Sequence, residues 1–180
     1  MRQRLFVFLG RDDFVLETVV VLVLDEGDGI VVIVGQDVVV LDRLGDMHWW
    51  QVAVKPAKPL AFGTVGGTPV FGHPGNPVSA LVSFELFARP ALRQMMGQRE
   101  LFRPELPAVA DEALRRHPDG KVHFVRVVAT TDGEGRIHVR RSGGQGSHLL
   151  RAMALANALA VLPDGAGVEA NATVKVMLLT

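Results

Sequence analysis

The sequence predicts an α/β domain followed by a small β domain, and three observations support this prediction. Continuous apolar runs at residues 19–24 and 30–34 are typical of strands buried on both faces of a parallel sheet. A helix-start signal follows at Asn76-Pro77, near the middle of the chain. Beyond residue 120, short alternating segments separated by tight turns indicate a domain built from strands alone.

The first domain is expected over residues 1–103 and alternates strands with helical segments. Its predicted strands are residues 29–34, 49–54 and 68–71. Residues 14–24 have the length of a helix but a β-branched composition that favours a strand, so both remain open. Residues 37–44 have helix-like spacing and stop at Gly45, a suitable C-cap.

The clearest local signal is the segment at residues 73–77, which reads His-Pro-Gly-Asn-Pro. Asn76 is a favourable N-cap, and Pro77 has the fixed φ that suits the first helical position. The helix that follows is expected to end near Gly97, and Pro90 inside it predicts a kink or break. Its apolar face is predicted to comprise Leu81, Phe84, Ala88, Leu92 and Met95, with Phe87 beside them.

The second domain is expected over residues 104–180. The prolines of residues 103–118 predict a linker or edge segment near the domain boundary. The predicted strands are residues 121–128, 136–140, 158–162 and 173–178, with a hairpin turn at residues 132–135 and one or two helical turns at residues 149–156.

Composition excludes several classes of protein. The 19 basic and 19 acidic side chains cancel, which argues against a bulk electrostatic grip on nucleic acid or an acidic membrane. The absence of cysteine excludes a disulfide framework, a cysteine-ligated metal and a thiol nucleophile. No apolar run approaches the ~20 residues of a membrane-spanning helix. We therefore expect a cytoplasmic protein that binds neither membranes nor nucleic acid.

Two segments of the first domain are candidates for binding an anion. Pro74-Gly75-Asn76-Pro77 leads into a helix whose free N–H groups suit phosphate or molybdate, although a purely structural turn explains it equally well. Lys55 and Lys58 lie in a proline-stiffened loop after a predicted strand, where α/β sheets bind ligands. For this loop, two solvated surface lysines are the simpler interpretation.

A third candidate is the glycine-rich segment at residues 143–148, which lies between two β segments. Its three glycines allow close approach of the backbone to a ligand, and Ser147 and His148 offer hydrogen bonds. A loop that merely needs positive φ values is the alternative. The six histidines are scattered, and none has the spacing of a catalytic zinc site.

Taken together and in this order, three segments resemble the molybdopterin molybdenumtransferase family of the MoeA type, which includes the gephyrin E domain. The segments are residues 50–63, 72–80 and 142–148. The resemblance implies a partial MogA-like α/β sheet domain followed by a small C-terminal β-barrel. It also implies a reaction, in which molybdate is inserted into adenylylated molybdopterin with Mg²⁺ and AMP is released, and it implies a homodimer.

The resemblance also implies roles for particular residues. Lys55, Lys58 and Asp37 fall at catalytic positions, and Asp37 is also the candidate carboxylate for Mg²⁺ or molybdate. The residues expected to bind the pterin substrate are Pro74, Gly75, Asn76, Pro77, Ser79, Gly144, Gln145, Ser147 and His148.

The upstream glycine-rich loop of the family is matched only in outline, by Gly29, Gly35 and Asp37. The chain is also less than half of a full family member. Three interpretations follow. The first is the C-terminal part of a molybdate-inserting enzyme, which need not be active alone. The second is a non-catalytic dimerisation or scaffold module of the gephyrin E-domain type. The third is an unrelated phosphate-binding α/β protein, which leaves the segment at residues 143–148 unexplained.

Overall fold

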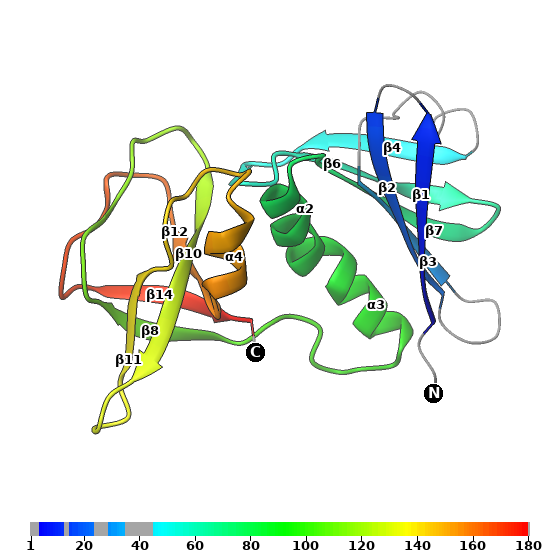
Figure 1. Ribbon diagram of the computed structural model, residues 1–180. Helices are drawn as coiled ribbons and strands as arrows, with labels where there is room; N and C mark the ends of the chain where they lie inside the picture. The colour runs from blue at the N-terminus through cyan, green and yellow to red at the C-terminus, as the bar shows by residue number, and fades with distance from the viewer. Residues whose placement is uncertain (1–3, 13–14, 24–28, 35–44, 180) are drawn as a thin grey trace. The chain divides into compact units, whose positions relative to one another are not determined.

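The computed structural model describes residues 4–12, 15–23, 29–34 and 45–179 (Figure 1). Its contacts divide the chain into two compact units. An α/β unit comprises Met1–Val52 and Ala57–Arg99, and a barrel unit comprises Ala53–Pro56 and Glu100–Thr180. The domain boundary expected between residues 103 and 104 remains a prediction. The candidate helix at residues 37–44 lies outside the described residues.

The α/β unit is built on a six-stranded mixed sheet in the order β1-β2-β3-β7-β6-β4. Only β3 and β7 run parallel, so the expected parallel sheet is wrong for most of its strands. The connections between β1, β2 and β3 are too short for the crossover of about a dozen residues that parallel pairing needs. The strands are β1 Arg4–Asp12, β2 Val15–Val23, β3 Gly29–Val34, β4 Asp46–Gln51, β6 Pro59–Val65 and β7 Thr68–His73.

Several strand predictions are confirmed by these bounds. Residues 29–34 form β3, and the ambiguous segment at residues 14–24 forms β2. The strand predicted over residues 49–54 is divided instead into β4 and the short β5 Val54–Lys55, which pairs in the barrel unit. The Gly66-Gly67 turn connects β6 to β7, and both glycines have positive φ.

A helical segment starts at Pro77 as predicted and continues to Met95 (Figure 1). It consists of α2 Pro77–Ser83, the π-helical turn η2 Phe84–Ala88 and α3 Arg89–Met95. Proline at position 90 has no N–H to donate, and the wide turn lies directly before it. Arg89 N–H accordingly reaches back five residues to the carbonyl of Phe84. The distortion predicted near Pro90 is thus confirmed as a π turn.

The predicted apolar face of this helical segment is only partly correct. Ala88 and Leu92 are buried and pack with Leu60 of β6 and Phe71 of β7, as the spacing predicts. Leu81 and Met95, in contrast, are 43% and 40% exposed. The π turn inserts an extra residue between them, so a stripe drawn with a constant 3.6-residue period does not follow the buried side.

The barrel unit closes a five-stranded sheet in the order β11-β8-β14-β12-β10, with β10 pairing back to β11. Its core is a cluster of small and β-branched side chains that includes Val127, Val139, Ala160 and Val176, none of them measurably exposed. The strands are β8 Glu105–Ala110, β10 Val122–Thr131, β11 Ile137–Arg141, β12 Ala158–Leu162 and β14 Thr173–Leu178, with α4 Leu150–Leu155 and a small pair of β9 Leu114–Arg115 and β13 Gly167–Val168.

The prediction that residues 103–118 form a linker or edge segment is wrong, because β8 is a strand of the closed barrel and β9 pairs with β13. Proline is tolerated in β8 for a geometric reason. Even-numbered residues of β8 bond toward β14, as the Leu178 N–H to Pro104 carbonyl bond shows, so the ring nitrogen of Pro107 faces the other edge. There β8 pairs with β11 only at Val109 and Ala110.

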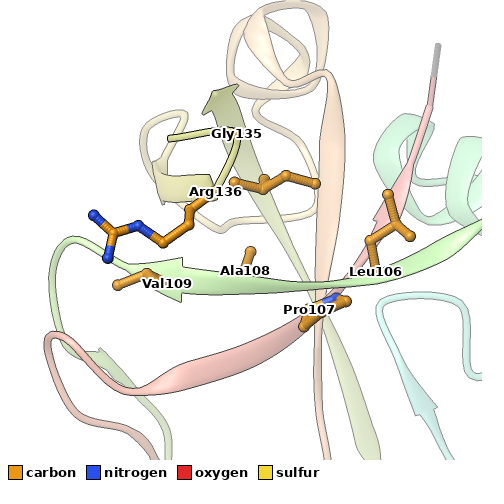
Figure 2. Close-up of a pocket in the computed structure, with 7 residues that line it drawn as sticks. Leu106, Pro107, Ala108, Val109, Gly135 and Arg136 are labelled. Atoms are coloured by element: carbon orange, nitrogen blue, oxygen red, sulfur yellow. The ribbon is translucent and has the colours of Figure 1, made fainter. Parts of the chain in front are cut away.

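The missing pairing beside Pro107 leaves a shallow recess of about 370 Å³ between β8 and the start of β11 (Figure 2). It is lined by Leu106, Pro107, Ala108, Val109, Gly135, Arg136 and Ile137. None of these is a predicted site residue. Among the described residues, no helix is long and apolar enough to cross a membrane.

Candidate functional site

Strand β10 is where two of the three predicted segments meet. At its start, β5 pairs with it in parallel, placing Lys55 opposite His123. The Val122 N–H donates to the carbonyl of Ala53 at 2.9 Å, which fixes the chain just before the lysine loop. Lys55 is therefore positioned by the barrel unit, whereas Lys58 belongs to the α/β unit.

The glycine-rich loop at residues 143–148 attaches to the same edge of β10, three residues further along. The side-chain amide of Gln145 accepts from the Arg126 N–H at 2.9 Å and donates to the Arg126 carbonyl at 3.2 Å. Its Nε2 also donates to the carbonyl of Gly143 at 2.9 Å. The amide thus pairs with both backbone polar groups of Arg126, as a neighbouring strand residue would. Arg126 lies between the part of β10 that pairs with β5 and the part that pairs with β11.

The side chain of Arg126 lies beneath this loop and is 1% exposed. Its Nη2 donates to the carbonyls of Gly144 and Gly146, at 2.8 and 3.2 Å. Its Nε is buried without a partner. Among the described residues no carboxylate forms an ion pair with it, and burial lowers the pKa of its guanidinium, which nevertheless stays charged at neutral pH.

Arg126 was missed by the sequence predictions. The signal was available, because an arginine stands inside the apolar run Phe124-Val125-Arg126-Val127-Val128 of a predicted strand. A charged residue in such a run is rarely buried unless something compensates it. Only the structure shows that the compensation comes from loop carbonyls some 20 residues away in the sequence.

Lys55 points to a charged cluster that the sequence did not predict. Its Nζ lies 3.7 Å from Oδ2 of Asp119, and its side chain is 62% exposed. Lys121 Nζ lies 3.4 Å from the same oxygen, and His123 Nε2 lies 3.1 Å from both oxygens of Asp119. Arg116 Nη2 donates to Oδ1 of Asp119 at 2.6 Å.

Asp119 is held as a carboxylate. Partial burial opposes its ionisation, but hydrogen bonds from His123 and Lys121 outweigh that effect and lower the pKa of Asp119 to about 2. Arg116, only 3% exposed, anchors the cluster by donating also to Asp164 at 2.8 Å and to the carbonyl of Lys121 at 2.6 Å. The start of β10 therefore carries a cluster of charges in which Arg116 fixes Asp119.

The third predicted segment belongs to the α/β unit. Asn76 has extended backbone angles before α2, but its side chain makes no capping bond. Pro74 is half-buried, Gly75, Asn76 and Pro77 are exposed, and Ser79 is 6% exposed. Beneath the turn, His73 lies at the end of β7 and its Nδ1 is 2.6 Å from Ser83 Oγ, both side chains being buried.

The predicted site residues thus fall into three groups. Lys55 and the loop with Gly144, Gln145, Ser147 and His148 share the barrel unit, where Ser147 is half-buried and His148 exposed. Lys58, which is exposed, and the turn at residues 74–77 share the α/β unit. Asp37 lies outside the described residues.

No group of three His, Asp or Glu side chains in the described part of the chain is placed to hold a metal ion. The one predicted Mg²⁺ ligand, Asp37, is outside that part of the chain. The described residues offer cationic side chains and backbone N–H groups, which are the groups that bind anions in proteins.

Comparison with known proteins bears on this arrangement. Residues 108–179 match the family model described as the MoeA C-terminal region (domain IV), and residues 36–94 match that of the probable molybdopterin binding domain. A barrel of the first type following a sheet domain of the second defines the class: proteins of molybdopterin metabolism.

Individual relatives agree with the family models. A molybdopterin molybdenumtransferase of Haemophilus influenzae is 37% identical over 139 residues, covering 76% of this chain and 34% of that protein. Molybdopterin molybdenumtransferase 2 of Mycobacterium tuberculosis is 42% identical over 124 residues, covering 68% and 30%. Gephyrin of Dictyostelium discoideum is 34% identical over 164 residues, covering 77% and 23%.

The fold agrees as well. The crystal structure of the molybdopterin biosynthesis moeA protein from Pyrococcus horikoshii matches with a TM-score of 0.64 at 22% identity, covering 86% of this chain and 36% of that one. The chain therefore belongs to the MoeA-type molybdopterin molybdenumtransferase family, as the three sequence segments predicted. It spans about a third of the length of the molybdenumtransferases it matches.

Proposed function

We propose that these 180 residues form part of the binding site of an enzyme that inserts molybdate into adenylylated molybdopterin and releases AMP. The observation that supports this most directly is the convergence on β10 of Lys55 and the loop at residues 143–148, around the buried cation of Arg126. The two segments lie within the regions that match the two family models, and relatives named as molybdopterin molybdenumtransferases align with 76% and 68% of this chain.

The loop can recognise an anion through its backbone. The carbonyls of Gly144 and Gly146 both point to Arg126. In a trans peptide the following N–H points the opposite way, so the N–H groups of Gln145 and Ser147 are directed away from the guanidinium. Donors on that side of the loop, supported by a buried positive charge behind it, suit a phosphate or molybdate oxygen.

In this proposal Lys55 supplies a mobile ammonium beside the loop, because its side chain is largely exposed and attached to the same strand. Within the α/β unit, Lys58 and the backbone N–H groups of Gly75, Asn76, Val78 and Ser79 are proposed as a separate set of anion contacts. Asp37 is the proposed carboxylate for Mg²⁺ or for molybdate. The structural contacts support the role of Lys55. The family resemblance supports the roles of Lys58, residues 74–79 and Asp37.

The working form is proposed to be a cytoplasmic homodimer. One observation favours an exposed contact surface: Trp49 and Trp50 on the edge strand β4 are 41% and 45% exposed. The same observation supports the second candidate, a scaffold module, which the likeness to gephyrin also favours. The two candidates differ in whether the chain binds the pterin nucleotide.

Calorimetric titration of the purified chain with adenylylated molybdopterin, with Mg²⁺ present, tests this function. We expect Lys55→Ala to weaken binding about tenfold, because a charge-assisted contact to a phosphate is lost. Lys175→Ala is a matched control, since Lys175 is also 62% exposed, lies in the same unit and pairs with a carboxylate, that of Glu105. Absence of binding by a folded wild-type chain that self-associates would favour the scaffold instead.

A further inference from the structure

The two oxygens of Asp119 are bound very differently. Oδ1 accepts from Arg116 at 2.6 Å, a short charge-assisted bond from an almost fully buried side chain. Oδ2 faces the ammonium groups of Lys121 and Lys55 at 3.4 and 3.7 Å. Both distances exceed the usual 2.7–2.9 Å of such bonds. Arg116 therefore fixes the carboxylate, while the two lysines are loosely engaged on its other side.

This end of β10 also has an excess of positive charge. Three permanent cations, Lys55, Arg116 and Lys121, surround two carboxylates, Asp119 and Asp164. Lys55 is 62% exposed and Lys121 27% exposed, so both ammonium groups can turn to a ligand without unfolding anything. Asp119 keeps its place when they do, because Arg116 and His123 still hold it.

We propose that Asp119 is the internal counter-ion of the Lys55 site and that Lys121 is a second cation gripping the same oxyanion. This inference rests on the proposed anion-binding role of Lys55. A tetrahedral dianion, either molybdate or a phosphate group of the pterin nucleotide, takes over the two ammonium groups that Asp119 Oδ2 holds in its absence. Asp119 thereby lowers the affinity for oxyanions and positions Lys55 and Lys121 before the ligand arrives.

The decisive variant is Asp119→Asn, which keeps the size and an acceptor oxygen for Arg116 but removes the charge. Repulsion between a carboxylate and a dianion a few ångströms away outweighs the small ordering effect of an exposed ion pair. We expect inorganic molybdate and inorganic phosphate to bind about three- to tenfold more tightly to this variant. Binding is measured by calorimetry at constant ionic strength, with thermal melting as the check on folding.

Two further variants make the test specific. Lys121→Gln is expected to weaken binding severalfold in the wild-type background, and the gain from Asp119→Asn is expected to vanish in Lys55→Ala. Asp132→Asn is the matched control, because Asp132 is an equally well-held carboxylate at the far end of β10, bonded to Arg136 at 3.0 Å. It is expected to leave oxyanion binding unchanged.

The outcomes separate this inference from the proposed function. If Lys55→Ala binds oxyanions and pterin nucleotide as the wild type does, the role of Lys55 itself fails. If Lys55→Ala weakens binding while Asp119→Asn leaves it unchanged or weakens it, only the counter-ion inference is overturned. A gain for molybdate that persists with saturating adenylylated molybdopterin assigns the site to molybdate, and its loss assigns it to the pterin phosphates.

Discussion

The turn at residues 74–77 and the loop at residues 143–148 are held in place by different interactions. The turn depends on backbone stiffness, with prolines at both ends and no capping bond from Asn76. Beneath it lies one buried neutral contact, between His73 and Ser83. The loop depends on side chains, since Gln145 bonds it to β10 and Arg126 binds two of its carbonyls.

The residues that hold each segment in place therefore lie in different parts of the sequence. The turn is fixed by residues inside the motif and by a histidine that burial keeps uncharged. The loop is fixed by a charged side chain outside the motif, on a strand that also receives Lys55. Protonation should therefore loosen the turn, whereas substitution of Arg126 should release the loop.

The largest expected effect is a loss of α/β-unit stability in acid. Burial lowers the pKa of His73 to about 4, from an unfolded value of about 6.5. The unfolded chain binds more protons between these values, so the stabilisation is complete above pH 6.5 and is lost as the pH falls toward 4. The free energy of unfolding lost over this pH range is about 3 kcal/mol, because the folded and unfolded pKa values of His73 differ by about 2.5.

Tryptophan fluorescence during denaturation measures this unit selectively, because both tryptophans of the chain lie on β4. The double variant His73→Leu with Ser83→Ala removes the pair together and should flatten the acid limb of the curve. His138 provides an internal contrast: a hydrogen bond to Asp111 raises its pKa, so its stabilisation is lost as the pH rises through that raised value. An unaltered acid limb in the double variant would contradict the assignment to His73.

The second prediction concerns the barrel unit. Arg126→Met retains the length and apolar stem of the side chain but leaves the carbonyl of Gly144 without its donor and that of Gly146 with only the Leu149 N–H. We expect a loss of about 1–3 kcal/mol, offset in part because no charge then needs to be buried. Amide hydrogen exchange at residues 143–148 should accelerate at least tenfold, and binding of adenylylated molybdopterin should weaken in parallel.

Arg115→Met is the control for that substitution, since Arg115 lies in the same unit but is 73% exposed, with Glu169 as its partner. Its loss should change stability by less than about 0.5 kcal/mol. Slow exchange at residues 143–148 in Arg126→Met would mean that Gln145 alone holds the loop. That result would remove Arg126 from the proposed site.

Features of the fold that depend on local sequence were predictable, and features that depend on packing were not. The helix start at Pro77, the hairpin at residues 132–135 and β14 were predictable, because turn chemistry and alternation are local. The exposure of Leu81 was not predictable, because the position of the π turn depends on packing. The strand β8 was not predictable either, because proline is tolerated there only where its nitrogen faces an unpaired edge.

The candidate site shows the same limit. The segments containing Lys55 and Ser147 were identified from composition and family resemblance. Their meeting on β10, and the roles of Arg126 and Asp119 between them, depend on contacts over some 20 to 60 residues of sequence. Local patterns cannot encode such contacts, so the residues that organise the site were found only in the structure.

The smallest expected effect belongs to the residue with the strongest sequence signal. Asn76→Ala usually costs a helix about 1 kcal/mol, but that cost arises from a lost side-chain capping bond. Asn76 makes none, and the bond from the Ala80 N–H to its backbone carbonyl, at 2.9 Å, survives the substitution. We therefore expect a change below about 0.5 kcal/mol, measured by tryptophan fluorescence during denaturation.

Gln145→Ala is the informative counterpart, because both residues are exposed amides in predicted anion-binding segments. Gln145 loses three hydrogen bonds, one accepted and two donated, so its substitution should cost about 1–2 kcal/mol and accelerate exchange at residues 143–148. Equal costs for the two substitutions would show that Asn76 caps the helix in solution. The turn and the loop would then both depend on side-chain bonds, and the contrast between them would disappear.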